Sequence, residues 1–386
     1  MKNTHHFTAA IPVGNVRRIV LPRRQLLVAV CLMLMTGESL AFQAADPRVG
    51  QKVIVTTAGA ELRTPQALVW RAFLGEVYQV KLTNGEWLWI EERGGWLWEK
   101  NVAFFDTAVA DVSRKLTTAP TAENFHLRGV VMLAHGRLNE AIEDFSESLR
   151  RQANNPGAFN NRGQAYYFRK DYASAIQDFS TAITQDPKSF IAYNNRALAE
   201  IELNQMDKAL ADLDVAIKLL PDYAEALNNR GVVFRKTDKL NDAIKDFSAA
   251  LKANPRYADA LGNRSYALRL QRNYTAAVAD LNAAIEIAPT MFEASNDLAW
   301  ILATCPEDGV RDGKRAVEMA LKACALTEYK EWNALDTLAA AYAESGDFDE
   351  AKRWIGTALP ISPAEEKERL QKHAELIEKG TPIREE

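Results

Sequence analysis

The sequence repeats itself with a period of 34 residues. An alanine, a small residue and a bulky apolar residue each recur five times at this spacing. The alanines are Ala141, Ala175, Ala209, Ala243 and Ala277; the small residues are Gly129, Gly163, Ala197, Gly231 and Ser265; the bulky residues are Phe145, Phe179, Leu213, Phe247 and Leu281. This period is typical of solenoids in which each repeat is a helix–turn–helix unit. It predicts a mainly α fold and favours binding over catalysis.

Each repeat also shares a motif of polar and apolar residues. The second and fourth repeats read Asn161-Arg-Gly…Ala175-Ile-Gln-Asp-Phe179 and Asn229-Arg-Gly…Ala243-Ile-Lys-Asp-Phe247. Prolines, which stop helices, recur at the same spacing and mark the boundaries between repeats: Pro187, Pro221, Pro255 and Pro289. The pattern closely resembles the tetratricopeptide repeat from residue 122 to about residue 360. The resemblance implies a right-handed superhelical solenoid of about seven repeats, which we place at 122–365.

The ends of the array and its sixth repeat depart from the motif. The turn of the sixth repeat carries an insertion at 306–313, and a seventh repeat follows it. We expect residues 105–120 to form a half-repeat helix that caps the first repeat. Residues 366–386 are expected to form a charged capping helix and a tail, since terminal repeats need a polar outer face.

Two columns of charge follow the same period. They consist of Arg128, Arg162, Arg196, Arg230 and Arg264, and of Asp144, Asp178, Asp212, Asp246 and Asp280. In the sixth and seventh repeats the arginine position holds Leu298 and Leu338, and the aspartate position holds Met319 and Trp354. Because both charges are lost together, we predict a structural Arg–Asp ladder between helices. The pairs form either within a repeat or between neighbouring repeats.

Residues 46–104 have a different pattern, with β-branched and alternating segments joined by tight turns. The order Gly75-Glu-Val-Tyr…Asn84-Gly-Glu-Trp-Leu-Trp-Ile…Gly95-Trp-Leu resembles a bacterial SH3-like domain. The resemblance implies a small β-barrel and raises peptides or cell-wall peptidoglycan as ligands. Four tryptophans either fill the core or form an exposed aromatic surface: Trp87, Trp89, Trp96 and Trp98. Strand alternation puts Leu88 and Ile90 on one face, which we expect to be the core.

In tetratricopeptide arrays the first helix of each repeat lines a concave groove, which the resemblance implies as the partner site. The expected groove residues are Asn160, Asn161, Gln164, Tyr167, Asn194, Asn195, Asn228, Asn229, Arg235, Asn263, Tyr266 and Arg269. Amide side chains both donate and accept hydrogen bonds, which suits them to an extended peptide. We therefore expect at least two of the amides at 161, 195, 229 and 263 to be exposed. The alternative is that they satisfy backbone groups between repeats.

Residues 1–41 are interpreted as a secretory signal peptide. They combine five basic residues, an apolar run at 26–35 and small residues near Ala41, which is the order that signal peptidase substrates show. Cleavage predicts an exported protein, periplasmic or secreted, without an integral membrane span. An uncleaved N-terminal membrane anchor is the alternative. Removing these residues, with five basic groups and Glu38, changes the formal net charge from −4 to about −8, which argues against nucleic-acid binding.

The residues show no pattern of catalysis. The histidines are scattered, and no metal-ligand spacing, phosphate loop or nucleophile motif occurs. We expect no cofactor and no metal, and expect Cys305 and Cys324 to be free and buried, because their helical positions place them too far apart for a disulfide. The sequence thus predicts an exported scaffold that binds a protein or peptide partner. The alternatives are a cell-envelope protein that binds peptidoglycan through the SH3-like domain, and an accessory subunit of an enzyme assembly.

Overall fold

The structure is a computed structural model that describes residues 46–385, except residues 58, 65, 66, 73 and 92. The predicted signal peptide, residues 1–41, lies outside the described residues. The described chain divides into two compact bodies, an amino-terminal body up to Asn229 and a carboxyl-terminal body from Arg230 onwards. The boundary falls inside helix α9 (Ala224–Lys236). Each body is described by itself.

The amino-terminal body begins with a seven-stranded antiparallel sheet in the order β3-β2-β6-β5-β4-β1-β7. The strands are β1 (Lys52–Val55), β2 (Ala60–Arg63), β3 (Leu68–Ala72), β4 (Val77–Asn84), β5 (Trp87–Ile90), β6 (Gly95–Trp98) and β7 (Val102–Phe104). Strand β4 pairs with β1 through its first half and with β5 through its second, and the register is irregular between Val80 and Leu82. The structure therefore has a small sheet at 52–104, where the sequence predicts a β domain.

The core of the sheet is aliphatic. Leu88 and Ile90 from β5 and Leu97 from β6 are fully buried, so the Leu/Ile face is the core, as expected from the strand alternation. A buried ion pair flanks this core, because Arg93 Nη2 donates to Glu76 Oε1 at 2.9 Å and both residues are at most 5% exposed. Tyr78 also donates its hydroxyl proton to Glu76, at 2.5 Å.

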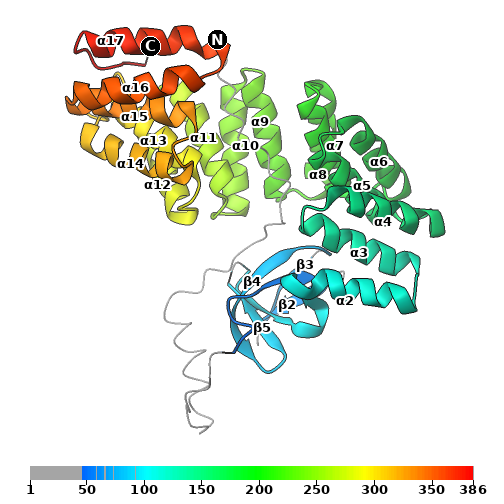
Figure 1. Cartoon of the computed structure of the whole chain (residues 1–386). Helices are drawn as coiled ribbons and strands as arrows, with labels where there is room; N and C mark the ends of the chain where they lie inside the picture. Colours follow the sequence, from blue (N-terminus) through cyan, green and yellow to red (C-terminus); the bar gives the residue numbers. More distant parts are fainter. Residues whose placement is uncertain (1–45, 58, 65–66, 73, 92, 386) are drawn as a thin grey trace. The chain divides into compact units, whose positions relative to one another are not determined.

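Helix α2 (Phe105–Thr118) connects the sheet to the repeats (Figure 1). Its apolar side packs Ala108 and Val112 against Ile54 of β1 and Val131 of the next helix. His135 Nε2 hydrogen-bonds the Phe105 carbonyl at 2.9 Å, and its ring stacks on that of Phe105. The sheet thus packs against the first repeat of the same body.

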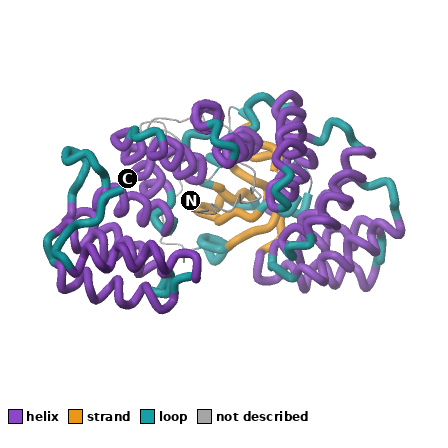
Figure 2. Tube along the Cα trace, turned by 90° about the horizontal axis from the view of Figure 1, so that it is seen from above, coloured by secondary structure: helices purple, strands orange, loops and turns teal. Residues whose placement is uncertain are grey.

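Seven helix pairs follow α2 among the described residues (Figures 1 and 2). Repeats 1 to 7 consist of α3 (Ala122–Ala134) with α4 (Leu138–Arg151), α5 (Pro156–Phe168) with α6 (Tyr172–Gln185), α7 (Phe190–Glu202) with α8 (Met206–Leu219), α9 with α10 (Leu240–Ala253), α11 (Ala258–Leu270) with α12 (Tyr274–Ile287), α13 (Phe292–Thr304) with α14 (Gly313–Leu326), and α15 (Trp332–Ser345) with α16 (Phe348–Ile361). Helix α17 (Lys367–Glu378) packs on α16.

The small-residue column gives room to an aromatic ring on the second helix of the same repeat. A Cβ atom added at Gly163 would lie 2.7 Å from the Phe179 ring, and the same holds for Gly129 with Phe145. Gly231 stands in the same relation to Phe247, at 2.6 Å. Repeats 3 and 5 carry a larger residue in this column, and the ring is replaced there by leucine: Ala197 with Leu213, and Ser265 with Leu281.

The Arg–Asp ladder is present, and each pair forms within one repeat. In all five repeats the arginine Nε and Nη2 atoms donate to both oxygens of the aspartate at 2.6–2.9 Å. A third bond reaches the preceding repeat, since Arg162 Nη1 donates to Ser146 Oγ and Arg264 Nη1 to Ser248 Oγ, both at 3.0 Å. The serine column was not singled out in the sequence, although it has the same period.

The turn between the two helices of a repeat contains one residue in the left-handed region. This residue is Gly136 in repeat 1, and Lys170, Asn204, Asp238 and Arg272 in repeats 2 to 5, with φ between 58° and 72°. Residues with a Cβ adopt this conformation at a cost of about 1 kcal/mol. The period therefore places backbone strain at the same point of successive turns.

We predict that Lys170→Gly raises the free energy of unfolding by about 0.5–1 kcal/mol, because glycine adopts this conformation without the Cβ clash. The measurement is urea denaturation followed by circular dichroism. Gly136→Lys is the reciprocal variant and should lower stability by a similar amount. A Lys170→Gly variant that is less stable than the wild type would contradict the prediction.

The sixth repeat has an eight-residue connection, 305–312, where repeat 5 has three residues, 271–273. Arg311 from this connection donates to the Cys305 carbonyl at 2.7 Å and pairs with Glu344 of α15 at 2.9 Å.

Cys305 and Cys324 are free and buried, which confirms the prediction for both. Burial raises the pKa of the Cys324 thiol to about 12. Among the described residues, no helix combines the length and apolar character needed to cross a bilayer.

Candidate partner-binding surfaces

The asparagines expected in the groove form a hydrogen-bonded ladder between first helices. Asn195 Nδ2 donates to Asn160 Oδ1 at 3.0 Å, and Asn229 Nδ2 donates to Asn194 Oδ1 at 2.9 Å. His126 occupies the corresponding position of repeat 1 and contacts Asn161 Nδ2 through its Nε2 at 3.0 Å. The amides of Asn160, Asn195, Asn194 and Asn229 thus contact each other across neighbouring repeats.

The expectation that at least two of the four amides are exposed is wrong. Asn195, Asn229 and Asn263 are at most 2% exposed, and their neighbours Asn194 and Asn228 are equally buried. The physical reason is that helices of successive repeats approach closely along this column, and buried amides need partners. Burial also lowers the pKa of His126 to about 4, which keeps its ring neutral.

Part of the predicted set in the amino-terminal body remains accessible. Asn160, Asn161, Gln164 and Tyr167 are half-buried. Tyr167 packs edge-on against Tyr172 with ring centroids 5.5 Å apart, so one side of its ring is used for packing. Gln164 lies on α5 beside the buried Gly163. These residues are the accessible polar part of the expected groove in this body.

The carboxyl-terminal body brings the other three predicted residues together. Arg235 of α9 and Arg269 of α11 each place a guanidinium over the Tyr266 ring, 4.8 and 5.0 Å from its centroid. All three side chains are half-buried. Burial lowers the pKa of Arg235 from its ordinary value. This Arg–Tyr–Arg cluster is a positively charged, aromatic feature.

The four tryptophans of the β domain lie on the outer face of the β5–β6 hairpin. They pair directly across the strands, Trp87 with Trp98 and Trp89 with Trp96. The first pair is stacked with centroids 6.0 Å apart and the second is edge-on at 5.3 Å. None of the four is buried, and Trp87 is 39% exposed. The interpretation of these tryptophans as core residues is wrong, because the aliphatic side chains of the same strands fill the core.

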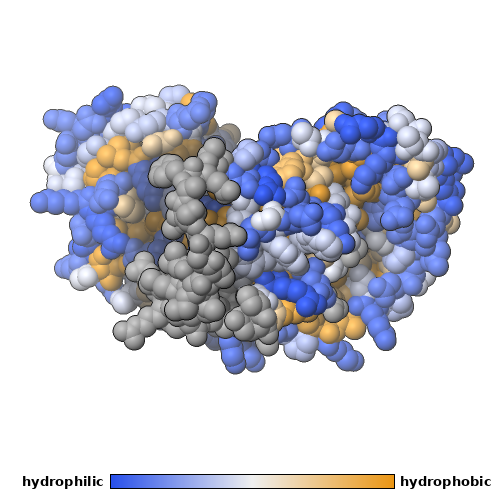
Figure 3. Space-filling model, turned by 90° about the horizontal axis from the view of Figure 1, so that it is seen from below, coloured by the Kyte–Doolittle hydropathy of each residue, from blue (hydrophilic) through white to orange (hydrophobic). Residues whose placement is uncertain are grey.

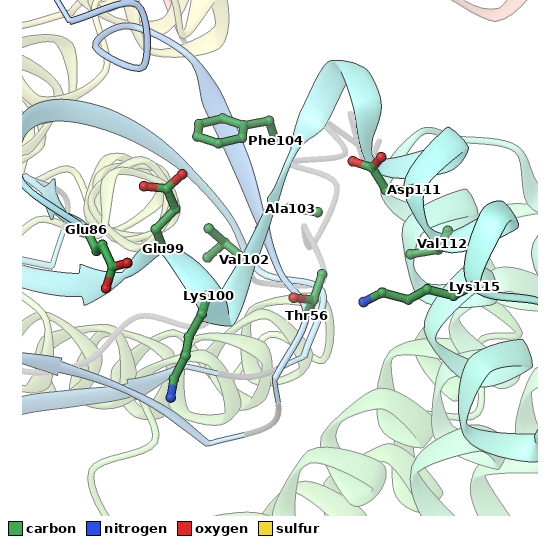
Figure 4. Close-up of a pocket in the computed structure, with 10 residues that line it drawn as sticks. All are labelled: Thr56, Glu86, Glu99, Lys100, Val102, Ala103, Phe104, Asp111, Val112 and Lys115. Carbon is green, nitrogen blue, oxygen red and sulfur yellow. The ribbon is translucent and has the colours of Figure 1, made fainter. Parts of the chain in front are cut away.

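An open pocket of about 480 Å³ lies between the end of the sheet and α2 (Figure 4). Glu86, Glu99 and Lys100 line its sheet side, and Asp111 and Lys115 line its helix side. The sheet-side charges contact protein groups, since Lys100 Nζ lies 3.3 Å from the centre of the Trp98 ring and Trp98 Nε1 donates to Glu86. No group of three or more His, Cys, Asp or Glu residues among the described residues could hold a metal ion.

Glu200 is a buried acid that the sequence analysis did not single out. It is 5% exposed, and its Oε2 atom has no hydrogen-bond partner among the described residues. Burial, reinforced by the nearby Asp212 charge, raises the pKa of Glu200 to about 7. The corresponding positions of other repeats hold Met132, Phe234 and Leu268, so its signal is a charge in an apolar column.

We predict that Glu200→Gln stabilises the protein at pH 8 by about 1–3 kcal/mol and has little effect at pH 4. The folded state holds a proton that the unfolded chain releases, so the contribution of Glu200 to stability falls as pH rises between about 4.5 and 7. The measurement is urea denaturation at both pH values. Glu202→Gln, at an exposed position of the same helix, is the control, and equal effects of the two variants would contradict the assignment.

Comparison with known proteins identifies the repeats. The tetratricopeptide repeat family model matches residues 127–190, 160–224 and 228–292. The chain carries tetratricopeptide repeats. Proteins with this repeat are generally interaction scaffolds and are typically non-catalytic. No curated protein matches the chain.

Solved structures share the fold at low identity. The Cut9–Hcn1 hetero-tetramer of the APC/C matches with a TM-score of 0.55 and 19% identity over 61% of this chain and 46% of that chain. Yeast Tom70 matches with a TM-score of 0.48 and 18% identity over 71% of this chain and 59% of that chain. The chain thus spans less than two thirds of either protein, and the likeness to the Cut9–Hcn1 structure concerns the fold alone. These matches contain no assignment of the β domain.

Proposed function

We propose that this protein is an exported scaffold that binds an extended segment of a partner protein on the first helices of its repeats. The observation that carries the proposal is the Arg–Tyr–Arg cluster of α9 and α11. The packing, Arg–Asp and Asn columns recur from repeat to repeat and are used internally. Arg235, Tyr266 and Arg269 bring cationic and aromatic groups together on a partly buried surface, where Arg269 already pairs with an acid, Glu385. Such a surface suits a polar or acidic peptide.

The test is affinity purification of the full chain from its native cells. Arg235→Ala with Arg269→Ala should reduce partner recovery at least about tenfold. The matched control is Lys245→Ala with Lys252→Ala, which removes two exposed positive charges from the second helix α10. Equal recovery with both double variants would refute the proposal. Circular dichroism of each variant checks that the repeats remain folded.

The exposed tryptophan pairs support a second candidate function, with the β domain as an SH3-like module that binds peptidoglycan. Stacked aromatic rings on an open face suit sugar rings or peptides. Trp87→Ala with Trp98→Ala should abolish co-sedimentation of the chain with cell-wall sacculi. Leu82→Ala, at another exposed apolar site of the sheet, is the control. Sedimentation that is unchanged in the tryptophan variant would refute this function. An accessory subunit of an enzyme assembly is the further candidate, and co-purification of an enzyme would support it.

Export is proposed on the sequence of residues 1–41 alone. Mass spectrometry of the mature protein from native cells should give a first residue directly after Ala41. An intact amino terminus in a membrane fraction would instead support the anchor. In either case the repeats face the compartment beyond the membrane.

A further inference from the structure

The chain turns back on itself after α17. Gly380 has φ 67°, in the left-handed region that favours glycine, and its N–H donates to the Ile377 carbonyl at 3.0 Å. The Thr381 N–H donates to the Leu376 carbonyl at 2.9 Å. Bonds of this kind end a helix and reverse the chain direction. The tail segment, defined as residues 381–385, then continues without helix or strand.

The tail segment crosses the carboxyl ends of the first helices of three repeats. Arg384 pairs with Glu344 of α15 at 2.7 Å. The Glu385 N–H donates to the carbonyl of Thr304, the last residue of α13, at 2.8 Å. Glu385 also pairs with Arg269 of α11 at 3.3 Å. The segment thus runs from repeat 7 through repeat 6 to repeat 5, all within the carboxyl-terminal body.

The contacts of the tail segment are those of a bound peptide. Ile383 is 2% exposed, whereas the neighbouring Arg384 is exposed, so one aliphatic side chain is inserted. The receiving groups are themselves held in place. Glu344 also accepts from Arg311 of the sixth-repeat connection, and Arg269 lies over the Tyr266 ring. Burial raises the pKa of Glu385 even though Arg269 and Arg272 act against the shift.

We propose that this surface is the binding site for an extended partner segment with an aliphatic residue and, two positions later, an acidic residue, and that the tail segment occupies it in cis as a competitor. The proposal rests on the proposed function and names both the ligand class and its regulation. The tail segment is held by one backbone bond, a bond from Arg384 Nη1 to the Ala303 carbonyl at 3.3 Å, and two ion pairs with partly exposed side chains. A partner can replace these contacts. The chain therefore contains its own inhibitor of this site.

Tethering makes the competition effective. Two residues separate the end of α17 from the tail segment, and short linkers produce effective concentrations of about 1 mM. A partner segment with the same contacts in trans must exceed this value or add contacts elsewhere. Binding is therefore expected to be weak until the tail segment is displaced or removed.

The test uses a labelled peptide with the sequence of residues 379–386, KGTPIREE. Fluorescence polarisation should detect binding to a chain that ends at Gly380, and at least tenfold weaker binding to the full chain. A full-length variant, Ile383→Asp with Glu385→Lys, should release the tail segment and bind the peptide as the truncated chain does. Because it leaves every helix unchanged, this variant keeps the test valid if truncation impairs folding. Glu375→Lys, at an exposed position of α17, is the matched control and should bind like the full chain.

The opened forms are the chain that ends at Gly380 and the Ile383→Asp with Glu385→Lys variant. The proposal would be overturned if neither opened form bound the peptide although circular dichroism showed it folded. It would also be overturned if the full chain and the opened forms bound the peptide with equal affinity. A KGTPIREE peptide with aspartate in place of its isoleucine should bind neither the full chain nor the opened forms. Hydrogen exchange distinguishes a tail segment that dissociates and rebinds from one that is permanently bound as part of the fold, which we call a structural staple. The Glu385 amide should exchange at least 100-fold faster than amides within α13, whereas exchange at the same rate would indicate a staple. If the tail segment is not a competitor, partner recovery by affinity purification from native cells is unaffected. A negative peptide assay is therefore distinguishable from failure of the proposed function.

Discussion

Arg230→Leu is expected to lower the free energy of unfolding by about 2–4 kcal/mol, because it leaves the Asp246 carboxylate buried without its cation. Both guanidinium bonds to Asp246 are short, at 2.7 and 2.9 Å, and Asp246 is 5% exposed. Adding Asp246→Met should restore at least half of the loss. This combination reproduces repeat 6, where Leu298 and Met319 occupy the two positions. Urea denaturation of the full chain measures both variants.

The control for this prediction is an exposed pair. Arg150 pairs with Glu147 on α4, and the Arg150 side chain is 69% exposed. Arg150→Leu should therefore lower the free energy of unfolding much less than Arg230→Leu does. Equal unfolding free energies for Arg230→Leu and for the double variant would contradict a stabilising role for the Arg230–Asp246 pair.

Gly163→Ala is expected to lower stability by about 1–3 kcal/mol, although alanine is the better helix former. The added methyl group would lie 2.7 Å from the Phe179 ring, which is fully buried and cannot move away freely. Phe179→Leu in the same chain should relieve the clash, as Ala197 with Leu213 does in repeat 3. The double variant should be more stable than the sum of the single effects predicts, by about 1 kcal/mol or more.

Gly356→Ala is the matched control for this prediction. Gly356 lies in α16, and nothing is within 4 Å of the position that its Cβ would take. Alanine there should raise stability by about 0.5–1 kcal/mol through helix propensity alone. If Gly163→Ala stabilises the protein as much as Gly356→Ala, the packing account of the glycine column is wrong.

The 34-residue period predicts most of the fold because residues that recur at this spacing make the same contact in successive repeats. The arginine and aspartate columns identify their own partners, since both are lost together in repeats 6 and 7. The asparagine column carried the same kind of signal, but its meaning was ambiguous. Asn160 and Asn195 are 35 residues apart, one more than the period, and this offset places them on facing sides of neighbouring first helices. The sequence pattern does not separate a groove from such an internal contact.

Features that occur once could not be derived from the period. Glu76 and Arg93 are 17 residues apart in non-repeating segments, and only the folded sheet brings them together. The tryptophans of β5 and β6 alternate with the core residues, so their exposure follows from the Leu/Ile face once that face is assigned. The tail segment has no repeat to compare with. Its position depends on the reversal at Gly380, which a glycine after a helix indicates without showing the destination.

A photo-crosslinking amino acid, placed on first and on second helices in native cells, tests directly whether the first helices bind the partner. Gln164 and Arg235 are the first-helix positions, and the exposed Lys218 and Lys245 are the second-helix controls. Mass spectrometry then identifies the crosslinked proteins. We expect the same partner protein to be captured from the first-helix positions and not from the controls. Capture from Lys218 and Lys245, with none from Gln164 or Arg235, would contradict it.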